Sequence, residues 1–256
     1  MKFENTEVYG FEGAIRGMRN PMNSWEKSDS KFNRYFDVNS GAMDVKYLLN
    51  DEPNAYIHHK NENGYYADII GKADLGLAQR LIRGGTEHRK FLRQIFVSVD
   101  ITAPLYWWKE ADTYRVGVTA NSTSTMHKLA TTPITIDCFE TDDYDGTLSL
   151  ADNPEEDYDG LDEISVFTED LIMVLENIRK KYLETKDICY WKELIRWLPE
   201  SWLQTRTVTM NYENLRNMYF QRRGHKLTEW RKSFIEWVES LPYAEELICY
   251  DPKKEN

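Results

Sequence analysis

Residues 100–128 read DITAPLYWWKEADTYRVGVTANSTSTMHK, and this stretch indicates both the fold and the candidate site. It begins as the end of a strand, turns at Pro104 into an aromatic-rich helix predicted to reach Arg115, and breaks at Gly117. The polar residues that follow are Thr119, Asn121, Ser122, Thr123, Ser124, Thr125, His127 and Lys128. Such a dense polar cluster after a rigid helix suits the binding of a small anionic or heterocyclic ligand better than it suits packing.

The composition predicts one folded domain. The chain has 256 residues, of which 41% are hydrophobic, and no Pro/Gly/Ser-rich linker separates two hydrophobic halves. We therefore predict a single domain over residues 1–256, with peripheral insertions at about 28–66 and an acidic loop at about 140–163. No apolar run is long enough to cross a bilayer, and the N-terminus lacks a basic region followed by an apolar one. A cytoplasmic protein without a membrane partner is expected.

Charge and metal-ligand patterns narrow the ligand class. The net charge of −11 argues against a nucleic-acid polymer, because binding its backbone needs clustered Lys and Arg, whereas a few arginines suffice for one phosphate. His58 and His59 have no third ligand at metal spacing, and the acidic loop does not match a calcium-binding loop, so no metal is predicted. The cysteines are predicted to be reduced core residues: Cys138, Cys189 and Cys249.

Hydrophobic periodicity and turn residues predict the other elements. A strand and a short helix with exposed Arg16 and Arg19 begin the chain. Helices are expected at Ala73–Arg83, 86–94 with Thr86 as cap, Ile164–Thr185, Cys189–Leu198, 211–223 and 228–242 with Thr228 as cap; strands are expected at 95–101, 133–139 and 202–210. Of the adjacent Trp107 and Trp108, one is expected in the core and the other at a cleft or an interface, because neighbours on a helix face different sides.

Residues 97–128 resemble the signature region of the flavin-dependent thymidylate synthases. In that family a strand and a helix precede the pattern R-H-R-x-x-S-x-N-x-x-S-x-R. The corresponding positions of this chain hold Tyr114, Arg115, Val116, Thr119, Asn121, Ser124 and Met126. Two further blocks resemble the family in the same order, GGTEHRKFLRQIFVSV at 84–99 and LPESWLQTRTVTMNYENLRNMYFQRR at 198–223. The likeness covers roughly residues 72–247.

The resemblance implies an α+β fold, with a central, mostly antiparallel sheet and a helical bundle, assembled as a homotetramer. It implies reductive methylation, or a related modification at C5, of a deoxypyrimidine monophosphate such as dUMP. FAD would be the cofactor, with methylenetetrahydrofolate and NADPH as cosubstrates. By position in the family pattern, the catalytic residues would be Arg222 and Ser124. The flavin-binding residues would be His88, Tyr114, Arg115, Thr119, Asn121 and Asn211. The substrate-binding residues would be Ser124, His127, Lys128 and Arg222.

Three substitutions leave alternatives open. Tyr114, Val116 and Met126 stand where the family pattern has arginine. Residues that could restore the lost positive charge are Arg115, His127 and Lys128 nearby, and Arg19, Arg216 and Arg223 from elsewhere. One alternative is a nucleotide-binding or regulatory homologue that has lost flavin chemistry. Another is an assembly component in which the polar cluster only caps helices and satisfies backbone groups.

Overall fold

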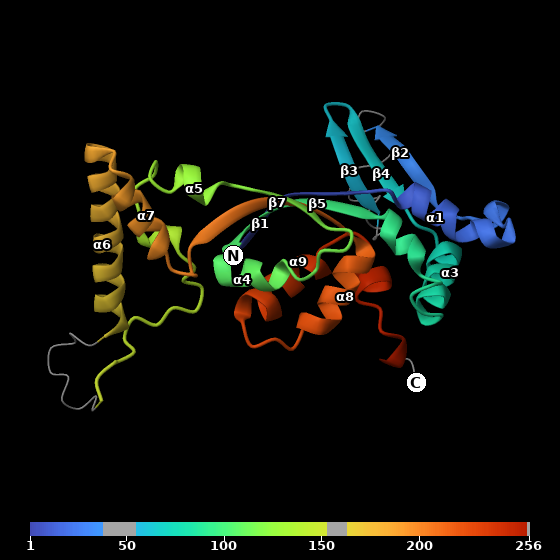
Figure 1. Cartoon of the computed structure of the whole chain (residues 1–256). Helices are drawn as coiled ribbons and strands as arrows, with labels where there is room; N and C mark the ends of the chain where they lie inside the picture. Colours follow the sequence, from blue (N-terminus) through green and yellow to red (C-terminus); the bar gives the residue numbers. More distant parts are fainter. Residues whose placement is uncertain (38–54, 153–162, 255–256) are drawn as a thin grey trace. The chain divides into compact units, whose positions relative to one another are not determined.

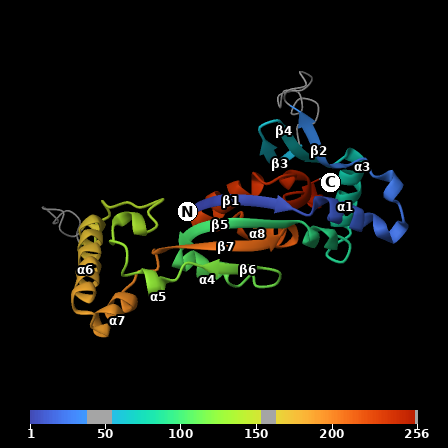
Figure 2. The same cartoon turned by 90° about the horizontal axis from the view of Figure 1, so that it is seen from above.

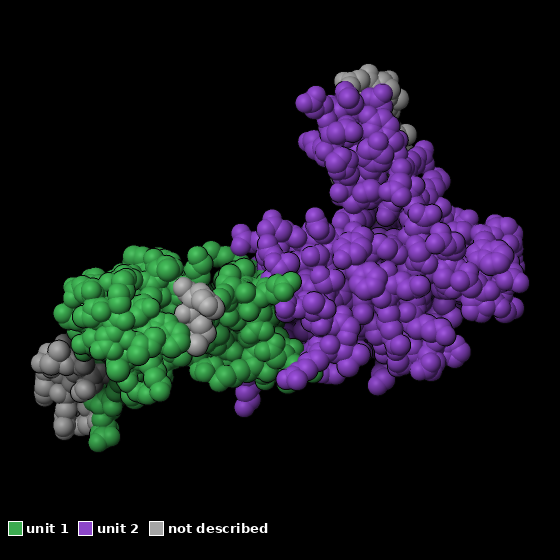
Figure 3. Space-filling view, turned by 45° about the horizontal axis from the view of Figure 1, so that its top comes forward, with its two compact units in different colours: residues 1–2, 101–113, 121–206 green, residues 3–100, 114–120, 207–256 purple. Residues whose placement is uncertain are grey.

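The computed structural model describes residues 1–37, 55–152 and 163–254, which form two compact units (Figure 3). Unit 1 comprises residues 1–2, 101–113 and 121–206, and unit 2 comprises residues 3–100, 114–120 and 207–256. The predicted insertion at 28–66 and the acidic loop at 140–163 lie partly outside the described residues. The single domain predicted from the sequence stays a prediction.

The described strands form two sheets, and the predicted α+β class is confirmed (Figures 1 and 2). One sheet has the order β1-β5-β7-β6, formed by β1 (Lys2–Tyr9), β5 (Phe96–Pro104), β7 (Leu203–Asn211) and β6 (Thr119–Ser122). The other has the order β2-β4-β3 and is antiparallel, formed by β2 (Lys31–Asp37), β4 (Gly64–Ile69) and β3 (Tyr56–Asn61). Within unit 2, α8 and α9 lie on one side of β1 and the β2-β4-β3 sheet on the other.

The helices vary in length and type. The α-helices are α1 (Phe11–Arg19), α3 (Lys72–Arg83), α4 (Leu105–Ala111), α5 (Thr125–Lys128), α6 (Ile164–Thr185), α7 (Ile188–Arg196), α8 (Tyr212–Arg222) and α9 (Ile235–Glu239). Short 3-10 helices span Asn20–Met22, Trp25–Lys27, Lys90–Gln94, Ile136–Cys138 and Pro252–Lys254, and π-helical turns span Glu229–Phe234 and Ala244–Ile248. In the described part of the chain, no helix combines the length and apolar character that a bilayer span needs.

Several predicted elements are confirmed, and others end elsewhere. The predicted α3, α6, β5 and β7 match within one to three residues at each end. The helix predicted to reach Arg115 ends at Ala111, because the Thr113 hydroxyl donates to the Glu110 carbonyl, 2.7 Å away, and the backbone amide of Thr113 donates to the same oxygen.

Three other predicted elements differ from the structure in type or extent. The strand at 133–139 is a 3-10 helix followed by a single bridge from Phe139 to Trp202. The helix at 86–94 is reduced to the 3-10 helix Lys90–Gln94, so Thr86 caps nothing there. The helix at 228–242 is divided into a π-helical turn and α9, and Thr228 has helical dihedral angles rather than a capping conformation. Tertiary packing overrides local propensity in these segments.

The core of unit 1 packs α6 and α7 against the segment before them. Its buried members are Leu129, Ile134, Phe139, Leu175 and Leu194. On the predicted apolar side of α6, Phe167 is 57% exposed and Val174 is 49% exposed, so only part of that side is covered. One of Trp107 and Trp108 was expected at a cleft or an interface, but both are buried within the chain, and the Trp108 indole N–H donates to the Gln204 carbonyl at 2.9 Å. Cys189 is exposed, not in the core.

A buried ion pair connects α1 and α3 in unit 2, and it corrects the expectation of an exposed Arg19. The Arg19 Nε donates to Asp74 Oδ1 at 2.6 Å, and the hydroxyls of Ser28 and Ser30 donate to Asp74 Oδ2 at 2.6 Å each. Burial opposes ionisation of Asp74, but these donors outweigh it and hold its pKa below the ordinary value. By contrast, Arg16 is exposed as predicted and pairs with Glu12 on the surface.

The Asp74→Asn substitution should lower the free energy of unfolding by about 3–5 kcal/mol, because it leaves the Arg19 charge buried without a counter-charge. Urea denaturation at neutral pH measures this. The matched control is Glu12→Gln, which breaks the exposed ion pair of α1 and should change the free energy by no more than about 0.5 kcal/mol. Equal effects of the two substitutions would contradict the structural role of Asp74.

A second carboxylate should make stability pH-dependent in unit 1. Arg179 donates to Glu176 at 2.6–2.7 Å, and these hydrogen bonds lower the pKa of Glu176 to about 2 against burial, with help from the Ile134 amide. A lowered folded pKa stabilises the fold above the ordinary value of 4.5 and loses that contribution as the pH falls towards 2. Between these pH values, the free energy of unfolding should therefore fall more steeply in the wild type than in Glu176→Gln. The control is Glu184→Gln, at an exposed glutamate, which should follow the wild type. Urea titrations at each pH measure this.

Candidate functional site

In unit 2 the loop after α4 lies along α8 and is fixed at both ends. At the C-terminal end of α8, the Tyr114 hydroxyl donates to Gln221 Oε1 at 2.8 Å and accepts from Arg222 Nε at 2.8 Å. At the N-terminal end, the Asn214 side-chain amide donates to the Val116 carbonyl at 2.7 Å. Residues 114–117 therefore have one defined path beside the helix.

The N-terminus of α8 is closed by two asparagines. Asn211 Oδ1 accepts from the Asn214 backbone amide at 3.0 Å, and Asn214 Oδ1 accepts from the Asn211 amide at 3.1 Å, which is a reciprocal capping box. Gly117, with φ of 77°, passes so close that a Cβ on it would lie 3.1 Å from Asn211 Nδ2. The predicted flavin-binding Asn211 is thus 7% exposed and has a capping role, with its Nδ2 facing the 114–117 loop.

The segment that carries the predicted His88 reaches the same end of α8. Arg89 pairs with Glu213 through two close contacts, Nε to Oε2 at 3.0 Å and Nη2 to Oε1 at 3.1 Å. Glu213 is buried in the first turn of α8, two residues after Asn211. The ion pair fixes the backbone beside His88 while the His88 side chain itself is exposed. Arg115 is likewise exposed next to the anchored Val116.

Three segments distant in sequence are therefore brought together at the N-terminus of α8. They carry the predicted cofactor residues His88, Arg115 and Asn211. A helix N-terminus with nearby basic side chains favours anionic groups, because the backbone dipole is positive there. Thr119 and Asn121 lie on β6 and are exposed. Whether any of these residues binds flavin stays a prediction.

Arg222, the predicted catalytic arginine, is enclosed by aromatic rings. Its guanidinium carbon lies 5.3 Å from the centre of the Tyr114 ring and 4.8 Å from that of Trp230, which is buried. Cation–π contacts of this kind restrict a guanidinium and contribute on the order of 0.5–2 kcal/mol each. Tyr114, expected among the flavin-binding residues, contacts Arg222 with both its ring and its hydroxyl. The aromatic cage was not predicted from the sequence.

Two of the arginines considered as substitutes for lost charge are used in the interior. Arg216 Nη1 donates to the carbonyls of Ile248 and Tyr250 at 2.7 and 2.6 Å, and burial lowers its pKa to about 10. Arg19 is held by Asp74, as described above. Arg216 and Arg19 are therefore wrong as substitutes for the lost positive charge. Arg223 lies near the surface, and its guanidinium group is 3.7 Å from the Asp251 carboxylate.

In unit 1 a cavity of about 310 Å³ gathers part of the polar cluster. Its lining includes Thr102, Thr123, Ser124, Thr125, Lys128, Thr132, Cys138 and Trp202. The Gln204 side-chain amide donates to the Thr123 carbonyl at 3.0 Å and to the Thr125 hydroxyl at 3.2 Å, which holds the cluster against β7. Hydroxyls beside an ammonium group are suited to an oxyanion such as phosphate. The side chain of His127 lies outside what the structure describes.

No protein-family profile and no curated protein matches the sequence. Solved structures do match: the flavin-dependent thymidylate synthase ThyX from Helicobacter pylori, complexed with FAD and dUMP, has a TM-score of 0.58 at 16% identity, covering 97% of this chain and 98% of that one. A second structure of Helicobacter pylori ThyX with FAD and dUMP has a TM-score of 0.57 at 15% identity, covering 97% of each chain. The chain has a ThyX-like fold. At this identity the relationship is one of fold and is distant.

Asn214→Ala should lower the free energy of unfolding by about 1–2 kcal/mol, because it removes half of the capping box and the bond to Val116. It should also increase amide hydrogen exchange at residues 115–118. The matched control is Asn217→Ala, since Asn217 is exposed on the same helix. If both variants exchange alike at 115–118, Asn214 does not fix the loop.

Proposed function

We propose that the protein is a divergent flavin-dependent thymidylate synthase-like enzyme that binds FAD and a deoxypyrimidine monophosphate such as dUMP. The reaction would be reductive methylation, or a related modification, at C5 of the base. The observation that carries the proposal is the convergence of the His88, Arg115 and Asn211 segments at the N-terminus of α8. The ThyX-like fold supports it, since two solved structures of Helicobacter pylori ThyX contain FAD and dUMP.

The residues at the α8 N-terminus fit a flavin in chemical type. His88 and Arg115 are exposed side chains on anchored backbone, so binding an anionic ligand would have to order these side chains but not the backbone that carries them. Arg89 and Glu213 neutralise one another and hold the wall in place. When bound, FAD would supply the redox chemistry of the reaction, and methylenetetrahydrofolate and NADPH are proposed as cosubstrates. The chain's own part is to bind and orient the reactants.

Roles for the substrate residues follow from charge. Arg222 would donate to a pyrimidine carbonyl and stabilise negative charge on the ring, with its direction set by Tyr114 and Trp230. Ser124 and Lys128, in the cavity of unit 1, would hold the phosphate. The homotetramer and the cytoplasmic location stay predictions.

A second candidate is a nucleotide-binding homologue without flavin chemistry. It is favoured by one observation: Tyr114, at a position where the family pattern has arginine, directs its hydroxyl to Gln221 and Arg222. The charge that an arginine would bring to a flavin phosphate is absent at that position. A colourless protein that binds dUMP but not FAD would support this candidate.

The binding experiment uses the purified full chain with FAD, followed by absorbance, and with dUMP, followed by calorimetry. We expect both to bind. Arg222→Lys keeps the charge but loses the planar guanidinium fork, so dUMP affinity should fall by about tenfold, or ~1.4 kcal/mol, while FAD affinity is kept.

Arg223→Lys at the adjacent, more exposed position is the control and should bind dUMP like the wild type. Thermal unfolding of each variant separates loss of binding from loss of fold. If neither FAD nor dUMP binds the folded wild type, both candidate functions fail. If Arg222→Lys binds dUMP normally, the role assigned to Arg222 is wrong.

A further inference from the structure

Gln221 lies next to Arg222 at the C-terminal end of α8, and the proposed function gives it no role. Neighbouring side chains of a helix point about 100° apart, yet Tyr114 contacts both of these. Its hydroxyl accepts from Arg222 Nε at 2.8 Å and donates to Gln221 Oε1 at 2.8 Å. One phenol oxygen therefore holds the two side chains at the same place beside the helix end.

The direction of these hydrogen bonds fixes the orientation of the Gln221 amide. A guanidinium nitrogen can only donate, so the Tyr114 oxygen accepts from Arg222 and leaves its own proton for Gln221 Oε1. A carboxamide has its two N–H donors on the nitrogen, away from the oxygen. Gln221 Nε2 is therefore turned away from Tyr114, and within the described residues it has no hydrogen-bond acceptor. The side chain is exposed, so this donor can meet a ligand.

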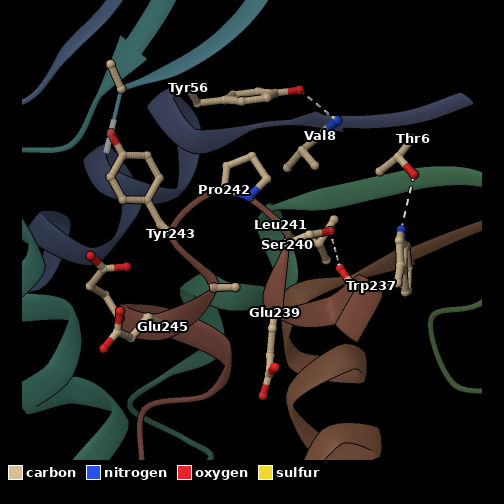
Figure 4. Close-up of a pocket in the computed structure, with 13 residues that line it drawn as sticks. Thr6, Val8, Tyr56, Trp237, Glu239, Ser240, Leu241, Pro242, Tyr243 and Glu245 are labelled. Carbon is tan, nitrogen blue, oxygen red and sulfur yellow. Dashed lines mark hydrogen bonds between the residues drawn. The ribbon is translucent and has the colours of Figure 1, made fainter. Parts of the chain in front are cut away.

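Gln221 differs in this respect from the polar side chains that line a cavity of about 520 Å³ in unit 2 (Figure 4). There the Trp237 indole N–H donates to the Thr6 hydroxyl at 3.1 Å, and the Tyr56 hydroxyl accepts from the Val8 amide at 3.2 Å. The Trp237 donor is thus already used within the protein. The oriented amide of Gln221 instead lies beside a residue to which the proposed function assigns substrate binding.

We infer that Gln221 is a specificity-determining residue that donates from Nε2 to the C4 carbonyl oxygen of a uracil base, alongside Arg222. This rests on the proposed function, in which Arg222 donates to a pyrimidine carbonyl. A carbonyl oxygen has two lone pairs and can accept from both side chains. Cytosine carries an amino group at the same position, which would place donor against donor. The unpaired donors would disfavour a cytosine nucleotide.

The test measures the affinities of the full chain for dUMP and dCMP by calorimetry and compares their ratio among variants. Gln221→Glu keeps an oxygen that accepts from Tyr114 but replaces the Nε2 donor by an acceptor. Its added negative charge acts on both nucleotides alike and cancels in the ratio. The control variant is Asn217→Asp, which adds the same charge at an exposed position one turn earlier on α8. A second variant, Tyr114→Phe, removes the hydroxyl that orients the amide.

The wild type should bind dUMP at least about tenfold more tightly than dCMP. Gln221→Glu should lower this preference by about tenfold or more, Tyr114→Phe should lower it in the same direction, and Asn217→Asp should keep it. Thermal unfolding of each variant checks that the fold is retained.

Three results would overturn the inference and leave the proposed function unaffected. They are equal binding of both nucleotides by the wild type, a wild-type preference in Gln221→Glu or Tyr114→Phe, and an equal loss of preference in Asn217→Asp. If the folded wild type binds neither nucleotide, the proposed function fails, and the inference fails with it.

Discussion

The hydrogen bonds of Asn214 are the contacts on which the candidate flavin site of unit 2 depends. One side chain satisfies the Asn211 amide through its oxygen and the Val116 carbonyl through its nitrogen. It thereby closes the N-terminus of α8 and also fixes the loop that follows α4. Because both bonds come from one side chain, the helix start and the surface loop at Val116 are tied to each other. The side chains of His88 and Arg115 are then presented from backbone that has little freedom.

The arginines of unit 2 differ in what their guanidinium groups contact. Arg19, Arg89 and Arg216 are used inside the fold, where they meet Asp74, Glu213 and backbone carbonyls. Arg222 lies against the rings of Tyr114 and Trp230. These rings restrict the guanidinium while leaving it a planar, charged hydrogen-bond donor. This property is what recognition of an electron-rich heterocycle requires.

Elements with strong periodicity were predictable from the sequence, as α6 and α3 show. The ThyX-like fold was also predictable, because three ordered blocks resemble one family. The aromatic cage was not, because Tyr114 and Trp230 are far apart in sequence and neither has a local signal. The capping box was detectable: Asn211 and Asn214 have the spacing of a helix start. The buried state of Arg19 was not, since its partner Asp74 lies in a different helix.

The central claim is that the His88, Arg115 and Asn211 segments form one binding surface at the N-terminus of α8. Amide hydrogen exchange of the full chain, with and without FAD, tests it most directly. The account predicts that FAD protects residues 85–89, 115–118 and 212–214 together, while α6 is unchanged. Protection of only one of these three segments, or of none while FAD is bound, would contradict it.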